Sequence, residues 1–446
     1  MKKSKSIQFS LMAMFVLIAT TQIISCQSKQ DKNAASEQSN DSAFVFSTPK
    51  VLKMEDAIVR HFKIGTQQKI ESGDYIFPLD ILDTAGFLSL SDVADDVEYV
   101  LLKTSNGKQE VFIGQGLNNV FICKDYIFVQ MCDNIIQYDR EGNLIRTIGR
   151  KGGGPGEYNW VFNMTVDDKT KRIIINTSGK INEYDFEGNF IRSQKNTYED
   201  QLMPIDSNRI AVEVKNVWRD VKERLVILNK KGEVEKSFPR YLLFDHTDYG
   251  QSSGSRPRLT KFHDIICFSE AYNDTIFELK NDELQMRYSL DWGKYAIKPD
   301  DVYNREKMVS KALCIYYETD RYLIIPAEIV ISFTVVYDKK DNQIRLGYPS
   351  RYSHSREFRK LFKYEILAGF FNDLDGGMVQ NVDGISLDCQ YVFSSYYASD
   401  VKEYFEEVGY GANPKYPDKQ AKLKALVDTI DEDKHNLLIM MSKLKE

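Results

Sequence analysis

The sequence predicts an all-β fold, and more narrowly a β-propeller built from four-stranded antiparallel blades. Composition is the first observation, because 26 Tyr and 25 Phe among 446 residues favour strands. The second is a hairpin pattern that recurs every 44 to 46 residues. Sheets of four short strands at this period are typical of a propeller, whereas one immunoglobulin-like sandwich needs about 100 residues.

The hairpin pattern consists of an alternating strand, a tight turn and a second alternating strand. Tyr138 and Tyr184 in its first two copies are 46 residues apart, and the turn glycines of the second and third copies are 44 apart. Clear copies are IIQYDREGNLIRTIG (135–149), INEYDFEGNFIR (181–192) and RLVILNKKGEVEKSF (224–238), and weaker copies are TIFELKNDELQMRYSL (275–290) and FTVVYDKKDNQIRLG (333–347).

Each turn carries residues suited to a short hairpin loop. Asp139 and its counterparts can bond the turn backbone, and Gly142 and its counterparts can supply the positive φ angle that a three-residue loop requires. Another apolar run precedes each hairpin, namely YIFVQ (126–130), RIIIN (172–176), RIAVEV (209–214) and DIICF (264–268). Each repeat therefore holds about four strands.

Residues 79–400 provide room for six or seven such blades. We expect the ring to close by pairing an early strand near 96–103 with late strands near 378–394, since closure removes exposed sheet edges. The tail has apolar residues at helical spacing, from Leu423 to Ile430, which predicts a helix near 417–431 followed by a strand at 437–441. The helix packs against the body or, alternatively, binds a partner.

The N-terminus has the features of an export signal. MKKSKS is followed by an apolar run that is too short to span a bilayer. Ile23-Ile24-Ser25-Cys26 resembles a bacterial lipobox, which implies a signal peptide at residues 1–25 and lipidation of Cys26; the alternative is a plain signal peptide that contains a Cys. Residues 26–43 are polar and predict a flexible tether to a propeller at 44–446. The expected location is the cell envelope, with the membrane as a partner through lipidated Cys26.

The segment IGRKGGGPGEY (148–158) is similar to the NHL-type propeller repeat. The whole chain more closely resembles the six-bladed β-propeller lipoproteins of Gram-negative gut anaerobes, through this segment, the lipobox, LSDVADDVEYVLLKT (90–104) and LLIMMSKLK (437–445). The resemblance implies six blades and an outer-membrane protein, facing either the periplasm or the outside. It implies no particular biochemical activity.

One face of the predicted propeller collects aromatic and charged side chains. Connectors between blades, and loops between second and third strands, emerge opposite the hairpin turns. Aromatic, Arg and Asp side chains there could bind a sugar or a peptide. The candidate ligand face comprises Arg150, Tyr158, Trp160, Trp218, His246, Asp248, Tyr249, Arg256 and Arg258. Alternatively, Tyr158 and Trp160 pack between blades and the charged residues are merely solvated.

Several function classes find no support in the sequence. The net charge of 59 − 65 = −6 argues against a nucleic-acid partner. No HExxH, CxxC or phosphate-binding glycine motif occurs, so we expect no metal, no cofactor and no catalytic residues. The G-x-S-x-G match at 250–254 lacks the flanking strand and helix of a nucleophile elbow.

The expected function is therefore a binding or scaffold module for a glycan, a peptide or an envelope protein. The alternative is a propeller lyase or hydrolase that acts on polysaccharide or peptide. That activity would require His246, Asp248, Tyr249 and Arg256 to lie within hydrogen-bond reach of one another.

Overall fold

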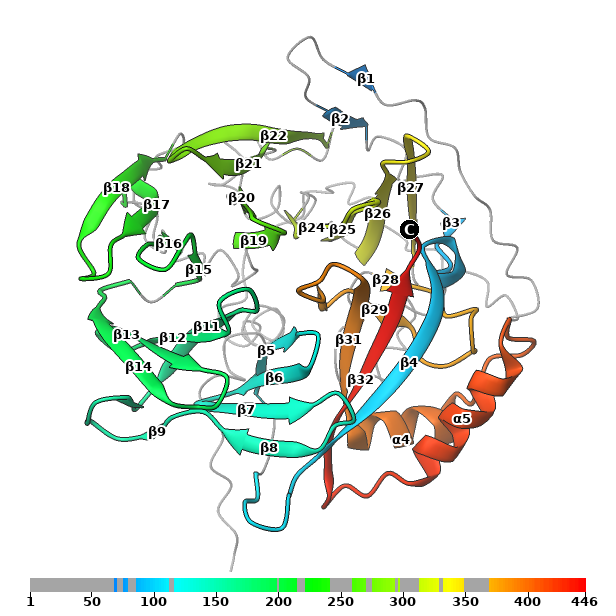
Figure 1. Ribbon diagram of the computed structural model, residues 1–446. Helices are drawn as coiled ribbons and strands as arrows, with labels where there is room; N and C mark the ends of the chain where they lie inside the picture. Colours follow the sequence, from blue (N-terminus) through cyan, green and yellow to red (C-terminus); the bar gives the residue numbers. More distant parts are fainter. Residues whose placement is uncertain are drawn as a thin grey trace, which may run out of the picture. The chain divides into compact units, whose positions relative to one another are not determined.

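Six four-stranded antiparallel blades stand in a ring in the part of the chain that the structure describes (Figure 1). The structure is a computed structural model. It describes residues 68–69, 75–78, 86–111, 116–198, 200–214, 221–240, 259–269, 275–292, 296, 313–328, 332–348 and 369–446. All of these belong to one compact unit, residues 57–446. The predicted fold class, a six-bladed propeller with a short C-terminal helix, is confirmed.

The first three blades are each formed by four consecutive strands, in order from the ring centre outward. Blade 1 contains β5 (Leu117–Ile122), β6 (Tyr126–Met131), β7 (Asn134–Asp139) and β8 (Leu144–Thr147). Blade 2 contains β11 (Val161–Asp167), β12 (Arg172–Thr177), β13 (Lys180–Asp185) and β14 (Phe190–Lys195). Blade 3 contains β15 (Leu202–Pro204), β16 (Ile210–Glu213), β17 (Glu223–Leu228) and β18 (Val234–Pro239).

Blades 4 and 5 follow the same order but gain an extra strand from the N-terminal part of the chain. Blade 4 contains β19 (Leu259–Phe262), β20 (Ile265–Ser269), β21 (Thr275–Lys280) and β22 (Glu283–Asp291). Blade 5 contains β24 (Tyr317–Glu318), β25 (Tyr322–Glu328), β26 (Ser332–Asp338) and β27 (Gln343–Tyr348), with β23 (Leu313–Cys314) also paired to β25. Strand β2 (Tyr75–Pro78) pairs in parallel with β22, and β3 (Gly86–Phe87) pairs in parallel with β27. A short strand, β1 (Gln68–Lys69), pairs with β2.

Blade 6 joins the two ends of the chain. Its strands are β30 (Gly384–Ile385), β31 (Tyr391–Tyr397), β32 (His435–Leu444) and β4 (Ala94–Lys103). The direct partner of the early strand β4 is therefore the C-terminal strand β32, while β31, at the end of the 378–394 region, lies one strand further in. An N-terminal strand thus completes a sheet whose other strands come from the C-terminal end (Figure 1).

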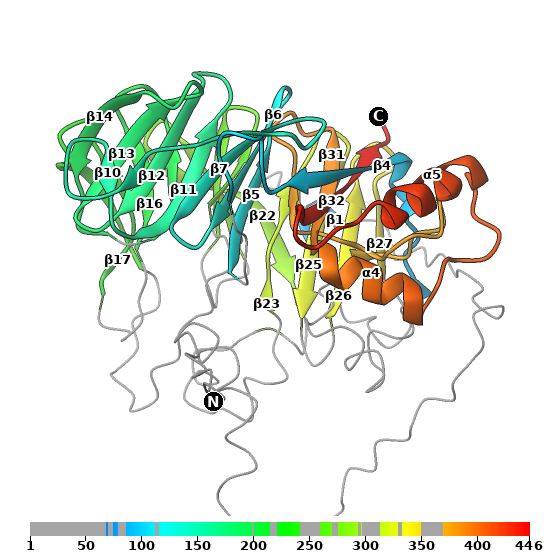
Figure 2. The same ribbon diagram turned by 90° about the horizontal axis from the view of Figure 1, so that it is seen from below.

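The innermost strands contact one another in a closed circuit. Each of β5, β11, β15, β19, β24 and β30 contacts the next, and β30 contacts β5. Figure 2 shows the blades edge-on, with helices α4 and α5 beside blade 6. The helices span Ala398–Glu407 and Pro417–Asp428, and α4 was not predicted from the sequence.

The five predicted hairpins are the third and fourth strands of blades 1 to 5. In the three clear copies the turn glycines have φ angles of 81°, 83° and 81°, as the loop geometry requires. The two weak copies lack this glycine. Asn281, Asp282 and Asn342 adopt positive φ there instead, because Asn and Asp tolerate the left-handed region better than other side chains.

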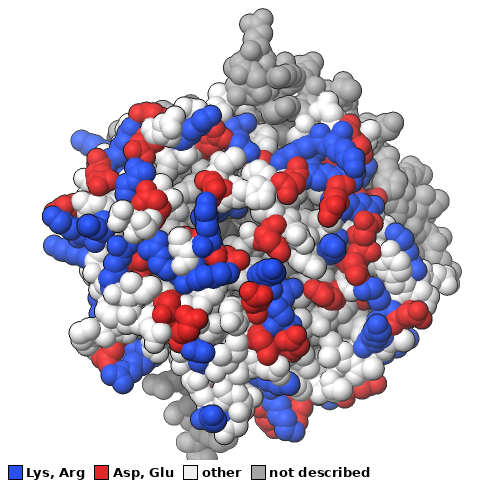
Figure 3. Space-filling view, in the orientation of Figure 1, with Lys and Arg blue, Asp and Glu red and all other residues white. Residues whose placement is uncertain are grey.

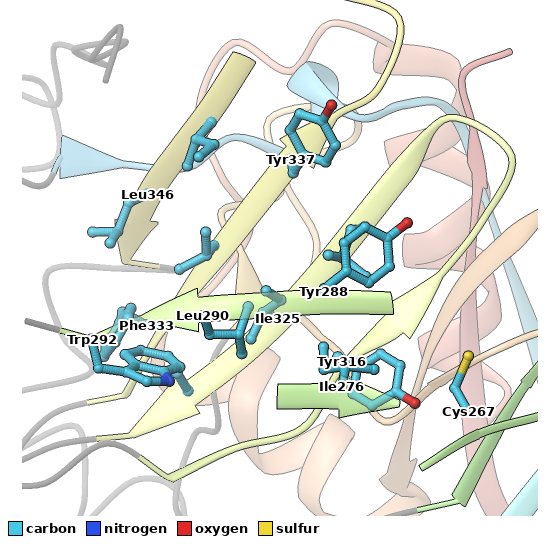
Figure 4. Close-up of a cluster of buried hydrophobic side chains, with 14 residues drawn as sticks. Cys267, Ile276, Tyr288, Leu290, Trp292, Tyr316, Ile325, Phe333, Tyr337 and Leu346 are labelled. Atoms are coloured by element: carbon cyan, nitrogen blue, oxygen red, sulfur yellow. The ribbon is translucent and has the colours of Figure 1, made fainter. Parts of the chain in front are cut away.

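Apolar side chains from neighbouring blades pack against each other. Between blades 4 and 5, Cys267, Ile276 and Tyr288 lie in one cluster with Phe333 and Leu346 (Figure 4). The second strand of a blade is apolar on both sides. In β12, for example, every residue of Ile173–Ile175 is buried, because neighbouring blades cover both faces of the sheet. Among the described residues, no helix is long and apolar enough to cross a membrane.

Short irregular elements complete the described chain. They are β9 (Arg150–Lys151) with β10 (Glu157–Tyr158), β28 (Gly369–Phe370) with β29 (Gln380–Asn381), and a 3-10 turn at Leu90–Asp92. The helices pack on blade 6 through Val401, Leu423 and Val427, which contact Leu101 and Leu438. Between β28 and β29, Asp375 accepts hydrogen bonds from Tyr99 and Asn372.

Candidate functional site

The antiparallel strand order gives the ring two distinct faces. The turn face carries the loop between first and second strands and the hairpin turn of each blade. The connector face carries the loops between second and third strands and the connections between blades, for example the residues around Asp133 and those from 148 to 160. Residues immediately before each innermost strand therefore lie at the inner edge of the connector face.

The turn face is crossed by ion pairs between blades. Lys169 Nζ of blade 2 lies 2.9 Å from Asp264 of blade 4, and His263 Nε2 of blade 4 lies 2.8 Å from Asp320 of blade 5. A longer contact of 3.8 Å joins Lys261 to Asp167. Figure 3 shows acidic and basic side chains intermingled over this face. Lys169 and Asp264 on this face are therefore already partnered with each other.

We name the positions that precede the innermost strands the connector rim. They are Gly116, Trp160, Gln201, Arg258, Tyr316 and Asp383, one for each blade. Arg258 lies outside the described residues. Tyr316 is buried, and the Gln201 side chain accepts a hydrogen bond from Leu259 N. Trp160 and Asp383 are the exposed members with side chains.

Asp383 is held by the second strand of its own blade. Its Oδ2 accepts hydrogen bonds from Ser395 N at 2.7 Å and from Ser395 Oγ at 2.8 Å. Its backbone is also fixed, because its N–H donates to Phe393 O and its carbonyl accepts from the Tyr317 hydroxyl. The carboxylate is thereby oriented before any ligand arrives.

The surroundings of Asp383 are unusual for an exposed side chain. Desolvation by the neighbouring protein raises the pKa of Asp383, and the two hydrogen bonds from Ser395 offset only part of that effect. The residue nevertheless retains access to solvent. Asp383 is therefore open to water on one side and closely surrounded by protein on the others.

Trp160 is the largest exposed apolar side chain on the connector rim, at 50% exposure. It follows the glycine-rich connector, whose conformation is fixed by its own contacts. Glu157 accepts hydrogen bonds from Arg150 Nε at 2.6 Å and from Gly154 N at 2.8 Å. The Tyr184 hydroxyl of blade 2 donates to Gly156 O. The connector therefore presents Trp160 from a fixed loop.

The predicted ligand-face residues have different surroundings in the structure. Arg150 is exposed and pairs with Glu157, and Trp160 is exposed. Tyr158 is buried and its hydroxyl donates to Ile148 O, which is the packing role that the sequence left open for it. The remaining predicted residues, Trp218, His246, Asp248, Tyr249, Arg256 and Arg258, lie outside the described residues, as do Ser252 and the lipidation candidate Cys26.

Sequence reasoning did not single out Asp383. The residue belongs to no repeat and no motif, and its partner Ser395 is twelve positions away. The one available signal was its position within the region of predicted late strands near 378–394. Equivalent positions in the other blades carry unrelated residue types, so alignment of the repeats would not have found it.

A second charged cluster lies between blades 4 and 5 and is fully paired. Glu318 Oε2 lies 2.7 Å from Arg287 Nε, and Glu318 Oε1 lies 2.7 Å from Lys339 Nζ and 2.8 Å from the Tyr288 hydroxyl. Burial opposes ionisation of Glu318, but Arg287 and Lys339 outweigh it and lower its pKa. The neighbouring Cys267 thiol has its pKa raised to about 12 by burial. We interpret this cluster as structural.

Comparison with known proteins identifies a family and a fold. A family model described as "Domain of unknown function (DUF4934)" matches residues 75–443. No curated protein matches the chain.

Three solved structures with some similarity to this chain are the following, and only the first has a TM-score above 0.5. A protein of Bacteroides fragilis NCTC 9343 described as a "Putative exported protein" is 14% identical, with a TM-score of 0.60 over 81% of this chain and 99% of that one. A member of the DUF4221 family from Bacteroides vulgatus ATCC 8482 is 11% identical, with a TM-score of 0.44 over 79% and 97%. BamB from Moraxella catarrhalis is 12% identical, with a TM-score of 0.28 over 48% and 57%.

Proposed function

We propose a ligand-binding function for this chain, which belongs to the DUF4934 family, whose description states no activity. The protein would act as a lipid-anchored module of the bacterial cell envelope. Its connector rim would bind a glycan, or alternatively a peptide or an envelope protein. The similar exported protein of Bacteroides fragilis supports the fold and is consistent with an exported place for this chain.

The observation that carries the proposal is that two exposed groups suited to a sugar lie on one rim, in blades 2 and 6, on either side of blade 1. Trp160 is half exposed, and Asp383 is oriented by Ser395 with one carboxylate oxygen left over. An aromatic ring that stacks on a sugar and a carboxylate that accepts hydroxyl groups are the usual elements of a carbohydrate site. On the turn face, by contrast, the Asp264 carboxylate already has Lys169 as its partner, and Asp320 lies 2.8 Å from the His263 ring.

Binding can be tested with the soluble protein comprising residues 44–446 on panels of glycans and envelope proteins. We expect at least one ligand to bind, and Trp160→Ala to weaken that binding by about tenfold, which is the effect of one stacking contact of about 1.4 kcal/mol. Met286→Ala is the control, because Met286 is a large apolar side chain, 46% exposed, on the outer strand β22. Equal loss in both variants, or no binding on any panel, would contradict the proposal.

Lipid anchoring is a separate part of the proposal. It is supported by the basic start, the short apolar run and the Ile23–Cys26 segment of the sequence. Metabolic labelling with a radioactive fatty acid should label the wild type but not Cys26→Ser. If the wild-type protein takes up no label, the proposal of lipid anchoring is wrong, but the proposed binding function is not affected.

The lyase or hydrolase alternative has no observation in its favour among the described residues. Its four required side chains, from His246 to Arg256, lie outside them. We therefore put forward the binding function alone.

A further inference from the structure

In the part of the chain that the structure describes, the Asp383 carboxylate is the best candidate for a ligand contact beyond the proposed function. Ser395 donates both its backbone N–H and its hydroxyl to one oxygen, Oδ2. Among the described residues, no hydrogen-bond donor and no cation contacts Oδ1. The side chain has access to solvent, so a ligand can reach that oxygen.

This arrangement differs from the buried carboxylates of the same ring. Glu318 is 5% exposed and lies against Arg287 and Lys339, and Asp338 lies against Arg321. Their charges are compensated within the protein, as buried charges usually are. Asp383 is desolvated by its neighbours without such a cation, so its negative charge remains available for a ligand.

We propose that Asp383 is a subsite for a protonated amine, carried by an amino sugar or by a lysine side chain. A compact ammonium group donates up to three hydrogen bonds and supplies the charge that Asp383 lacks. The inference rests on the proposed function, because Asp383 lies on the same connector rim as Trp160. The inference adds that one part of the bound ligand is a protonated amine.

A metal ion is a poorer fit than an amine. Calcium and magnesium require about six oxygen ligands, usually from several carboxylates. Among the described residues, Asp383 belongs to no group of three or more His, Cys, Asp or Glu side chains that could hold a metal ion. One oriented carboxylate is sufficient for an ammonium group.

Asp383→Asn tests the charge while keeping the fold. The amide retains one oxygen that can accept from Ser395 N, so the link between β30 and β31 persists. Asp388→Asn is the matched control. Asp388 lies in the same blade at the other end of β30, is exposed, and also accepts bonds from a serine hydroxyl, Ser386 Oγ, and a backbone N–H, Gln390 N.

The probes are a glucosamine tetramer, its N-acetylated form and tetralysine, measured by calorimetry on residues 44–446 at neutral pH. The acetylated tetramer keeps the sugar and removes the charge, while tetralysine keeps the charge and removes the sugar. We expect an amine probe to bind the wild type and Asp388→Asn with equal affinity. Its affinity for Asp383→Asn should be lower by about tenfold or more, because that variant loses a hydrogen bond to a charged group. Binding should also weaken as the pH falls and Asp383 becomes protonated.

Each outcome distinguishes the two proposals. Equal affinity of Asp383→Asn and the wild type for amine probes, or no amine binding by folded wild type, overturns the amine subsite. If another ligand still binds in a Trp160-dependent manner, the proposed function survives that result. Loss of amine binding in Asp383→Asn without any effect of Trp160→Ala supports the subsite and contradicts the role of Trp160.

Discussion

Within the described chain, an added strand pairs with the fourth strand of blades 4 and 5, whereas the fourth strands of blades 1 to 3 and of blade 6 have no such partner. Parallel strands β2 and β3 lie along β22 and β27, and β4 closes blade 6. Within the described chain, no further strand pairs with β8, β14 or β18. The N-terminal strands β2 and β3 therefore cover the outer edges of blades 4 and 5, while β4 forms the outer edge of blade 6.

The uncovered edges are protected by side chains instead. Arg146, Arg192, Lys195 and Lys236 lie on the three outer strands. Lysine and arginine on an edge strand disfavour pairing with another chain. Unwanted pairing at an outer strand edge is thus prevented by an added strand in blades 4 and 5 and by charged side chains in blades 1 to 3. This difference predicts where substitutions will lower the unfolding free energy most.

The largest effect is expected at the buried charge cluster between the covered blades 4 and 5. Glu318→Gln leaves Arg287 and Lys339 without their shared carboxylate. Breaking such a buried pair costs about 3–5 kcal/mol of unfolding free energy. Denaturant titration of the wild type and Glu318→Gln measures this loss of unfolding free energy. Glu98→Gln, in an exposed pair with Arg140, should cost less than about 1 kcal/mol, and equal costs would refute the distinction.

The same cluster predicts a pH dependence. The pKa of folded Glu318 lies below its ordinary value of 4.5, so its stabilising effect is complete above that value and is lost as the pH falls through the folded pKa. The difference in unfolding free energy between wild type and Glu318→Gln should therefore shrink on acidification below about pH 4.5. A constant difference down to pH 3 would contradict this.

A second large effect is expected where β4 and β32 close the ring. Ile439 is fully buried on β32, and Ile439→Ala should cost about 2–4 kcal/mol through the cavity it creates. Ile191→Ala on the uncovered strand β14 should change the unfolding free energy by less than about 0.5 kcal/mol, because Ile191 is 47% exposed. A large cost at Ile191 would mean that this edge is covered after all.

A smaller effect separates two equivalent turn glycines. Gly142 and Gly188 have nearly the same φ, 81° and 83°, so alanine at either position is strained by about 1–2 kcal/mol. A methyl group at Gly142 would also overlap the Leu101 carbonyl of β4, whereas at Gly188 it would make ordinary contacts with the side chains of Arg146 at 3.4 Å and Ile148 at 3.5 Å. Thermal unfolding should therefore show the lower melting temperature for Gly142→Ala, and the reverse order would be inconsistent with the close packing on β4.

The smallest effect concerns the uncovered edges themselves. Ile191→Lys and Val234→Lys replace exposed apolar residues on β14 and β18. Their unfolding free energies should change by less than about 0.5 kcal/mol, while self-association at high concentration decreases, because charge on an edge opposes pairing. Analytical ultracentrifugation measures the association. Strong destabilisation would instead indicate that these side chains are buried against another part of the protein.

The sequence by itself determined the blades. Tyr138 and Tyr184, and the turn glycines that follow them, mark a period that only a repeated sheet explains, and Leu423 to Ile430 mark the helix α5. These features depend on residues close together in the chain, whose spacing reflects backbone geometry directly.

Only the tertiary structure decided which residues share the connector rim. Asp383 is made distinctive by Ser395 and Tyr317, and Trp160 lies on the same rim although 223 positions separate it from Asp383 in the numbering. The pairing of β4 with β32, more than 300 residues apart, was likewise set by closure of the ring. Such neighbours leave no local pattern, because side-chain surroundings arise from distant segments only after the ring has formed.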